Sequence, residues 1–483
     1  MSGASQHAGQ FLLLKRRSPL KDLPPASNVL TSMRSQVSTK DSSAEKVLPM
    51  RFRGPKSIFS TIATVALLTC SAATGASQDS PRSVDAGDSP AGIWIGAAQL
   101  NAHEVPFRLE VAGSGDQVRA ALINGKEKSA ASSGSYANEH MILHFDYYAN
   151  TLDATVEHGT LTGTFGGRGR SVSVTARLNG KIPVADANPP RIGALWEIGV
   201  ENGAKGEHTW KLKVRQTGPS VNAVIERIDG DTGNLYGIWR DGAFTVSHFT
   251  AAGPNFVVLR PQPDGTLQVE TAAHGGAIQT FTAHRVSPVQ TMALESTDDP
   301  LHHTFLKNPD EPLKFRFPDL NGKLVSSEDS EFAGKALIVS IGGSWCPNCQ
   351  DEAPFLEELY RKYHSRGLEI VELSFEESSQ LPDPVRLRAV IRRYGITYPV
   401  LLAGTPDQLS ERFPHVKNLD CWPTTFFVGK DGLVKAIHTG YAGPATGGDN
   451  HALESGVTAQ VERLLAGKAT SPQSRAIQVA QKQ

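Results

Sequence analysis

Two cysteines stand three positions apart in the last third of this 483-residue chain. Cys346 and Cys349 frame the segment Trp345-Cys346-Pro347-Asn348-Cys349, and the chain has two other cysteines, Cys70 and Cys421. Two thiols at this spacing can form a disulfide and exchange it with another, because thiolate attack on a disulfide sulfur is the exchange step. The motif therefore predicts dithiol–disulfide exchange, a chemistry that needs no cofactor.

The residue between the first cysteine and Asn348 indicates how the pair is held. Pro347 suits the first turn of a helix, because its missing N–H would be unpaired there in any residue. Cys346 then lies at the helix N-terminus, where free N–H groups and the helix dipole favour a thiolate. Cys349 follows on the same side of the helix. We predict that Cys346 is the nucleophile and Cys349 the resolving thiol.

Two other uses of the cysteine pair are weaker interpretations. A zinc site needs two further ligands, which Cys421 and a histidine could supply, but there is no second C-x-x-C or H-x₃-H. A purely structural disulfide would close so short a loop that it adds little stability. The sequence therefore favours exchange and predicts no metal.

The surrounding pattern predicts an α/β domain over residues 313–467. Residues 336–341 are almost continuously apolar, as in a strand buried on both faces. A helix is expected from Pro347 to about residue 364, and Pro354 is expected to kink it. The further elements expected are a strand at 369–374, a helix at 385–394, a strand at 398–402, a hairpin of 424–428 and 433–438, and a helix at about 450–465.

On these residues the sequence resembles the thioredoxin superfamily, and more narrowly its TlpA/ResA-like thiol–disulfide oxidoreductases. The resemblance covers about residues 313–465 and rests on the C-x-x-C segment, on Glu352 three residues beyond it, and on Trp422-Pro423-Thr424-Thr425-Phe426-Phe427. It implies a cis bond before Pro423, which lies against the disulfide and helps to hold a substrate chain.

Further roles follow from the same resemblance. It implies that Glu352 lies beside the buried cysteine and tunes proton transfer; an ordinary glutamate in the first helical turn is the alternative. Trp345, Pro347 and Trp422 are expected to support the site. The resemblance also implies protein disulfides as substrates and a membrane-bound electron donor.

Two departures from the family pattern affect these expectations. The dipeptide between the cysteines is Pro-Asn, whereas the family often has proline at its second position, so the reduction potential cannot be carried over. Cys421 precedes Pro423 by two residues and would point to the same side of an extended loop. It is a candidate third redox thiol, with a buried small apolar residue as the alternative.

The middle of the chain has a different pattern, with short runs of alternating apolar and polar residues between turns rich in Gly, Asn and Asp. Two copies can be aligned at an offset of about 100 residues, with Trp94 matching Trp196. The sequence thus predicts two all-β modules, each a barrel or sandwich, at residues 91–186 and 187–287. They are expected to dock a partner or bind a ligand.

A candidate export signal lies at residues 50–76. Arg51, Arg53 and Lys56 precede an apolar run at 58–68, which is too short to span a bilayer. We expect export, into a bacterial periplasm, without a stable membrane span after cleavage. Residues 1–49 are expected to be disordered and not translated, with Met50 as the true start. Lipidation of Cys70 is disfavoured because Thr69 precedes it.

The expected architecture is therefore a multidomain chain of two β modules and a thioredoxin-like domain, with linkers at 77–90 and 288–312 and a disordered tail at 468–483. Its net charge of −1, from 48 Lys+Arg against 49 Asp+Glu, gives no reason to expect nucleic acid as a partner. We expect the enzyme to reduce disulfides of exported proteins. The alternatives are a thiol peroxidase of the same fold and a ligand-binding protein with an ancillary redox domain.

Overall fold

The structure is a computed structural model that describes residues 89–201, 203–272, 277–286 and 299–467. The expected signal peptide at 50–76, Cys70, the segment 1–49 and the tail at 468–483 lie outside these ranges, as do most of the linker 77–90 and the start of the linker 288–312. Within these ranges, no helix is both long enough and apolar enough to cross a membrane.

The first β module is one nine-stranded antiparallel sheet in the order β4-β3-β2-β1-β9-β8-β7-β6-β5. Alternate residues of β7 face inward, which is how its period-two pattern forms one wall of a core containing Trp94, Phe145 and Phe165. Its strands are β1 Gly92–Leu100, β2 His103–Ala112, β3 Arg119–Asn124, β4 Glu127–Ala130, β5 Ser133–Ala137, β6 His140–Phe145, β7 Asn150–Glu157, β8 Thr160–Gly167 and β9 Arg170–Leu178.

The second β module repeats this succession of strands. Its sheet runs β11-β10-β18-β17-β16-β15-β14-β12-β13, and an additional β11–β12 pairing closes it into a barrel. Its strands are β10 Ala194–Gly199, β11 Thr209–Thr217, β12 Ser220–Arg227, β13 Gly230–Asp231, β14 Leu235–Arg240, β15 Ala243–Thr250, β16 Gly253–Pro261, β17 Leu267–Ala272 and β18 Ile278–Arg285.

The two tryptophans aligned in the sequence have the same role in both modules. The indole N–H of Trp94 donates to Pro90 O at 2.9 Å, and that of Trp196 donates to Ile192 O at 2.9 Å. The modules differ in closure, because β12 pairs with β14 along a ladder whereas β3 and β5 of the first module have no such ladder. These features support a repeated β unit.

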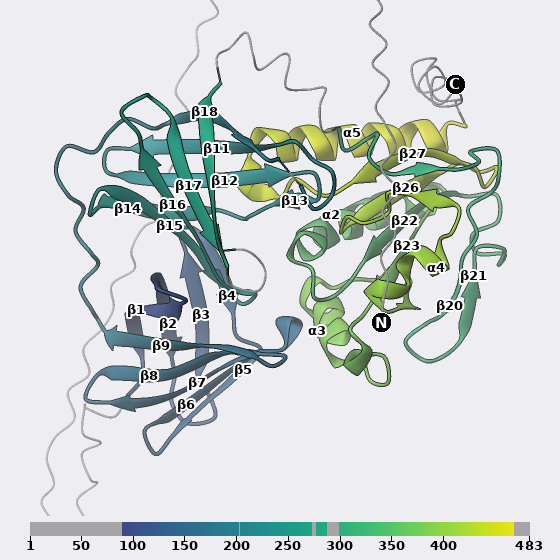
Figure 1. The fold of residues 1–483 in the computed structure, drawn as a ribbon. Coiled ribbons are helices and arrows are strands. Elements are labelled where there is room, and N and C mark those ends of the chain that lie inside the picture. Colours follow the sequence, from purple (N-terminus) through teal and green to yellow (C-terminus); the bar gives the residue numbers. More distant parts are fainter. Residues whose placement is uncertain (1–88, 202, 273–276, 287–298, 468–483) are drawn as a thin grey trace, which may run out of the picture. The chain divides into compact units, whose positions relative to one another are not determined.

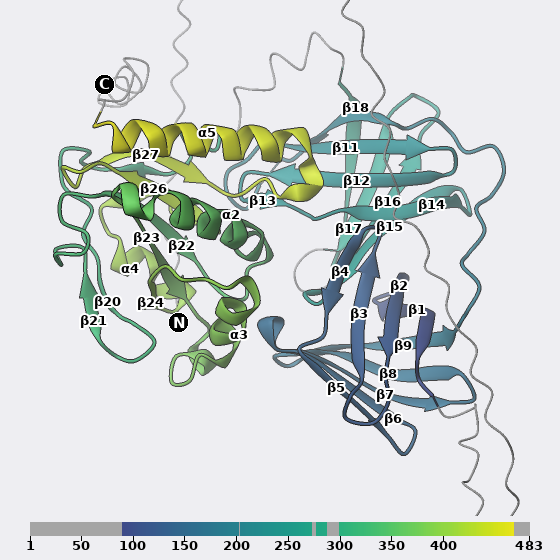
Figure 2. The same ribbon diagram turned by 180° about the vertical axis from the view of Figure 1, so that it is seen from behind.

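The C-terminal domain is built on a five-stranded sheet in the order β24-β23-β22-β26-β27 (Figures 1 and 2). The central strand β22 is buried at all seven positions, as its apolar run predicts, and its carboxyl end leads to Cys346. The elements are β22 Ala336–Gly342, α2 Pro347–Tyr363, β23 Leu368–Phe375, α3 Val385–Tyr394, β24 Val400–Gly404, α4 Leu409–Arg412, β26 Thr424–Val428, β27 Val434–Thr439 and α5 Gly448–Leu465.

Short elements that the sequence pattern did not indicate complete this domain. β19 lies within the segment 288–312, which was expected to be a linker, and β20 lies just after it. β19 pairs with β25 and so belongs to the C-terminal domain. A two-residue strand is too short to produce a periodic pattern. These elements are β19 Phe305–Leu306, β20 Arg316–Pro318, β21 Leu324–Ser326, β25 Val416–Lys417 and the 3₁₀ turns η3 His364–Arg366, η4 Ser378–Gln380, η5 Pro406–Gln408 and η6 Pro444–Thr446; one further 3₁₀ turn, η1 Asp146–Tyr148, lies in the first β module.

Candidate dithiol site

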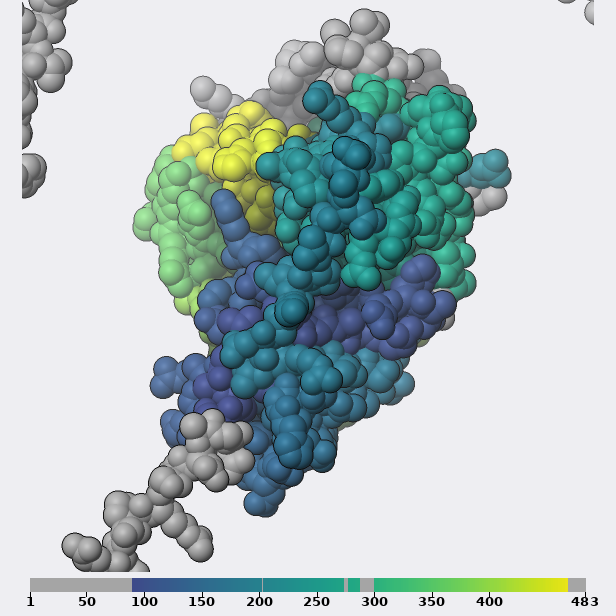
Figure 3. Space-filling model, turned by 90° about the vertical axis from the view of Figure 1, so that its left-hand side faces the viewer, coloured from purple at the N-terminus to yellow at the C-terminus, as the bar shows by residue number. Residues whose placement is uncertain are grey.

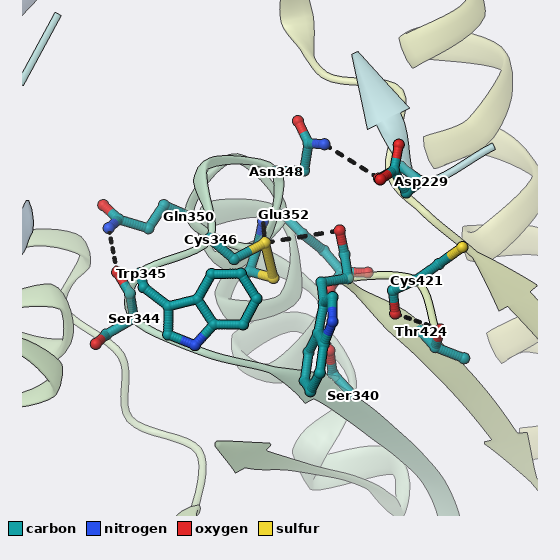
Figure 4. The surroundings of a disulfide bond; sticks show 12 residues. Asp229, Ser340, Ser344, Trp345, Cys346, Asn348, Gln350, Glu352, Cys421 and Thr424 are labelled. Carbon is teal, nitrogen blue, oxygen red and sulfur yellow. Dashed lines mark hydrogen bonds between the residues drawn. A yellow bond between two sulfur atoms is a disulfide. The ribbon is translucent and has the colours of Figure 1, made fainter. Parts of the chain in front are cut away.

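The two cysteines of the motif form a disulfide at the start of α2 (Figure 4). Their Cα atoms are 5.3 Å apart. As predicted, α2 begins at Pro347, and Cys346 is its N-cap, with its Sγ accepting a hydrogen bond from the Cys349 N–H at 3.1 Å. That N–H and the N-terminal end of a 17-residue helix would stabilise the Cys346 thiolate once the disulfide is reduced.

The loop before β26 borders the first cysteine. The Trp422–Pro423 peptide bond is cis, as the resemblance implies. The carbonyl oxygen of Trp422 lies 3.6 Å from Cys346 Sγ, and the Trp422 ring meets the Trp345 ring edge to face at 5.3 Å. The cis-proline loop and the tryptophan before the motif therefore enclose the sulfur, and only 3% of Cys346 is exposed.

Glu352 is a buried carboxyl near the pair, on the same helix (Figure 4). Its Oε1 accepts a hydrogen bond from the Thr425 hydroxyl at 2.8 Å, and its Oε2 accepts one from Ser340 at 3.0 Å. Burial raises the pKa of Glu352 to about 7, although these two hydrogen bonds oppose the rise. A cavity of about 10 Å³, near the minimum for one water, adjoins Glu352 and His438. The carboxyl is thus placed to hold or release a proton near neutral pH.

A second carboxyl near Cys349 was not found from the sequence. A Cβ atom at Gly342 would lie 3.5 Å from both Cys349 Sγ and Glu372 Oε1, so both groups converge on this glycine. Burial, followed by the charges of Glu376 and Glu352, raises the pKa of Glu372 to about 8. The available signal was a glutamate in the interior of the mostly apolar strand β23, which also contains Glu369 and Ser374.

The turn that leads into the motif is held by a buried ionic network. Arg386 and Glu376 pair at 2.9 Å with both side chains fully buried. The Ser344 N–H and hydroxyl donate to the two oxygens of Glu376, each at 2.7 Å, and Arg386 Nε donates to the Ser344 oxygen at 2.6 Å. Burying these charges is costly unless they are paired, so the network fixes this turn. Neither Arg386 nor Glu376 was among the site residues predicted from the sequence.

Cys421 lies near the pair without facing it. It is fully buried, and its sulfur points away from the disulfide in Figure 4. Burial raises the pKa of the Cys421 thiol well above its ordinary value. Whether it acts as a third redox thiol stays a prediction.

One cluster among the described residues has the side-chain types of a metal site. The ligand atoms of His303, Asp420 and Cys421 lie within 4.8 Å of one another. In the structure, however, one oxygen of Asp420 accepts hydrogen bonds from His303 Nε2 at 2.7 Å and from Cys421 Sγ at 3.3 Å. These three groups could hold a metal ion, but in the structure they are hydrogen-bonded to one another.

Comparisons with known proteins agree with this C-terminal geometry. Residues 309–437 match the model of the AhpC/TSA family. The thiol-disulfide oxidoreductase ResA of Bacillus subtilis (strain 168) is 30% identical over 126 residues, which are 26% of this chain and 64% of that protein. ResA of Geobacillus kaustophilus (strain HTA426) is 32% identical over 111 residues, 23% of this chain and 58% of that protein. This chain thus spans less than two thirds of the length of these relatives.

One solved structure is similar to about a third of the chain. It is a thiol:disulfide interchange protein of the thioredoxin family from Chlorobium tepidum TLS, 26% identical, with a TM-score of 0.25, covering 32% of this chain and 97% of its own. Together, the family match and the ResA similarity support a ResA-like domain of the thioredoxin superfamily in the C-terminal part of the chain.

Proposed function

We propose that this protein is an exported thiol–disulfide oxidoreductase that reduces disulfides of other exported proteins. The observation that carries the proposal is the placement of Cys346 Sγ, which accepts the Cys349 N–H at the N-terminus of α2 and lies 3.6 Å from the carbonyl oxygen of Trp422. The similarity to ResA over this region supports the same chemistry.

The reaction starts from the reduced pair. The Cys346 thiolate attacks one sulfur of the substrate disulfide, forming a Cys346–substrate bond, breaking the substrate S–S bond and releasing the first substrate thiolate. The Cys349 thiolate then attacks Cys346 Sγ, which forms the intramolecular disulfide and releases the second substrate thiolate. The substrate gains two electrons and two protons, and a donor dithiol restores the pair.

Glu352 has a defined part in the second step. Cys349 must lose its proton before it can attack, and a carboxylate with a pKa near 7 accepts a proton readily at that pH. We assign Glu352 as this acceptor, with Ser340 and Thr425 fixing its orientation. Pro423 and Trp422 are assigned to the surface that receives the substrate chain.

Export, the direction of electron flow and a membrane-bound donor complete the proposal. They rest on the segment 50–76 and on the resemblance of the motif set to periplasmic reductases. A measured reduction potential for the pair discriminates the direction, because a value well below that of periplasmic oxidants favours reduction.

The test is turnover of a protein disulfide by the wild type and by Cys346→Ser. We expect turnover by the wild type alone; equal turnover by both proteins would end the proposal. Rapid reaction of the reduced wild type with hydrogen peroxide would instead favour the thiol peroxidase alternative.

A further inference from the structure

A hairpin of the second β module reaches the dipeptide between the two cysteines. The hairpin tip, residues 228–231, consists of the two-residue turn after β12 and of the short strand β13. Its Asp229 carbonyl oxygen accepts a hydrogen bond from the side-chain amide of Asn348 at 3.1 Å (Figure 4). The variable part of the C-x-x-C motif is therefore already bound to another module of the same chain.

The hairpin tip also holds the loop that follows β27. The Asp231 carboxylate accepts the Gly443 N–H at 2.6 Å and the Gly233 N–H at 2.7 Å. Burial is the main cause that raises the pKa of Asp231, and these backbone hydrogen bonds oppose the rise. One aspartate thus ties the tip to a loop of the C-terminal domain.

The hairpin tip packs so closely on the C-terminal domain that no side chain fits at the centre of this contact. A Cβ atom at Gly230 would lie 2.2 Å from the Asn348 amide nitrogen and 2.9 Å from Tyr441 O, and one at Gly440 would lie 2.5 Å from Ile228 O. Gly230 also has a φ of +130°, which side chains rarely tolerate. Backbone packs on backbone at this point.

Further contacts on either side of the hairpin tip join the second β module to the C-terminal domain. The Lys205 ammonium donates to the Asp420 carbonyl oxygen, two residues before Trp422. Arg215 donates to Ala445 O at 3.1 Å, and the Lys213 ammonium pairs with Asp449 at the start of α5, which adjoins the second module in Figure 3. The module therefore meets the C-x-x-C dipeptide, the cis-proline loop and the segment after β27.

From these contacts we propose that the hairpin tip covers the surface beside Cys346 to which a protein substrate would bind. Such a substrate must displace the hairpin tip. This inference rests on the proposed function. Attack on the substrate disulfide requires Cys346 Sγ to approach one substrate sulfur in line with the other, and Cys346 is only 3% exposed. A small disulfide needs little room there, whereas a folded protein brings a wide surface. The second β module thereby selects which disulfides the site accepts.

The test uses Gly230→Ala in the full chain, because the added methyl group collides with the Asn348 amide and pushes the tip away. The matched control is Gly253→Ala in the same module, where φ is +115° and no atom lies within 4 Å of the new Cβ. Pre-reduced proteins, freed of reductant, are mixed with insulin or with hydroxyethyl disulfide, and the single-turnover rate of Cys346–Cys349 disulfide formation is measured.

We expect the ratio of the insulin rate to the small-disulfide rate to rise about tenfold in Gly230→Ala, as loss of one or two hydrogen bonds to the tip would shift its equilibrium. The ratio should stay unchanged in Gly253→Ala. An unchanged or lower ratio in Gly230→Ala overturns the inference. If that variant does not fold by circular dichroism, Asp231→Ala replaces it with the same two outcomes. Should the wild-type dithiol react with neither disulfide, the proposed function itself fails.

Discussion

Replacing Glu352 by glutamine should remove a specific pH dependence of stability. The pKa of Glu352 is about 7, against 4.5 for an ordinary glutamate. Because the folded state holds this proton more tightly, the stabilisation is complete below about pH 4.5 and is lost as the pH rises past about 7. At about 1.4 kcal/mol per pKa unit the full loss is about 3.5 kcal/mol, of which about 2.5 kcal/mol falls between pH 5 and pH 9.

The assay is urea unfolding of the oxidised wild type and of Glu352→Gln at about pH 5 and about pH 9, on either side of this window. Pulsed alkylation of the buried Cys421, read by mass spectrometry, reports unfolding of the C-terminal domain alone. The loss of stability between the two pH values should be smaller in Glu352→Gln by about 2.5 kcal/mol. The charge of Glu352 also raises the pKa of Glu372. Glu352→Gln removes this charge and lowers the pKa of Glu372, which further reduces the loss of stability between the two pH values.

The matched control is Glu358→Gln, an exposed position on the same helix. It should lose as much stability as the wild type does between the two pH values. If Glu352→Gln also matches the wild type in this respect, Glu352 is not a buried acid of raised pKa, and its assignment as proton acceptor fails. If Glu352→Gln is less stable than the wild type by the same amount at both pH values, that difference reflects only the lost hydrogen bonds of Glu352.

Three further outcomes are expected. Cys349→Ser should accumulate a covalent adduct between Cys346 and a protein substrate, visible on non-reducing gels, because the resolving thiol is absent; no adduct would contradict the assigned roles. Arg386→Leu should lower the free energy of unfolding by about 3–5 kcal/mol in urea titrations, since Glu376 is left buried without its partner, and a change under about 1 kcal/mol would refute this. Cys421→Ser should leave turnover and adduct trapping unchanged if Cys421 only packs; a marked loss of either would favour the third redox thiol.

Local patterns predicted the C-terminal domain well, because its chemistry is encoded within a few residues. Pro347 predicted the first residue of α2, and the apolar run before it predicted the fully buried β22. The helix at 385–394 and the strand at 424–428 have the expected bounds. Each of these features depends on neighbours in the sequence, which is the range over which periodicity and helix-start signals act.

The supports of the site could not be predicted in the same way, since their partners are far apart in the chain. Glu376 contacts Ser344 from 32 residues away, and Arg386 contacts it from 42 residues away. In the sequence, both look like ordinary charged residues near a strand end and in a helix. Only the fold removes them from water and makes their pairing necessary.

The Pro-Asn dipeptide shows why a reduction potential cannot be transferred from relatives by motif alone. Asn348 donates its side-chain amide to Asp229, which is 119 residues away and in a different module. If this hydrogen bond is about 1 kcal/mol stronger in one redox state than in the other, the potential shifts by about 20 mV. That change follows from the presence of the second β module, and no comparison of the C-x-x-C segments could detect it. In that case the potential of the pair would depend on both modules, and displacement of the hairpin tip by a substrate would change it during the reaction.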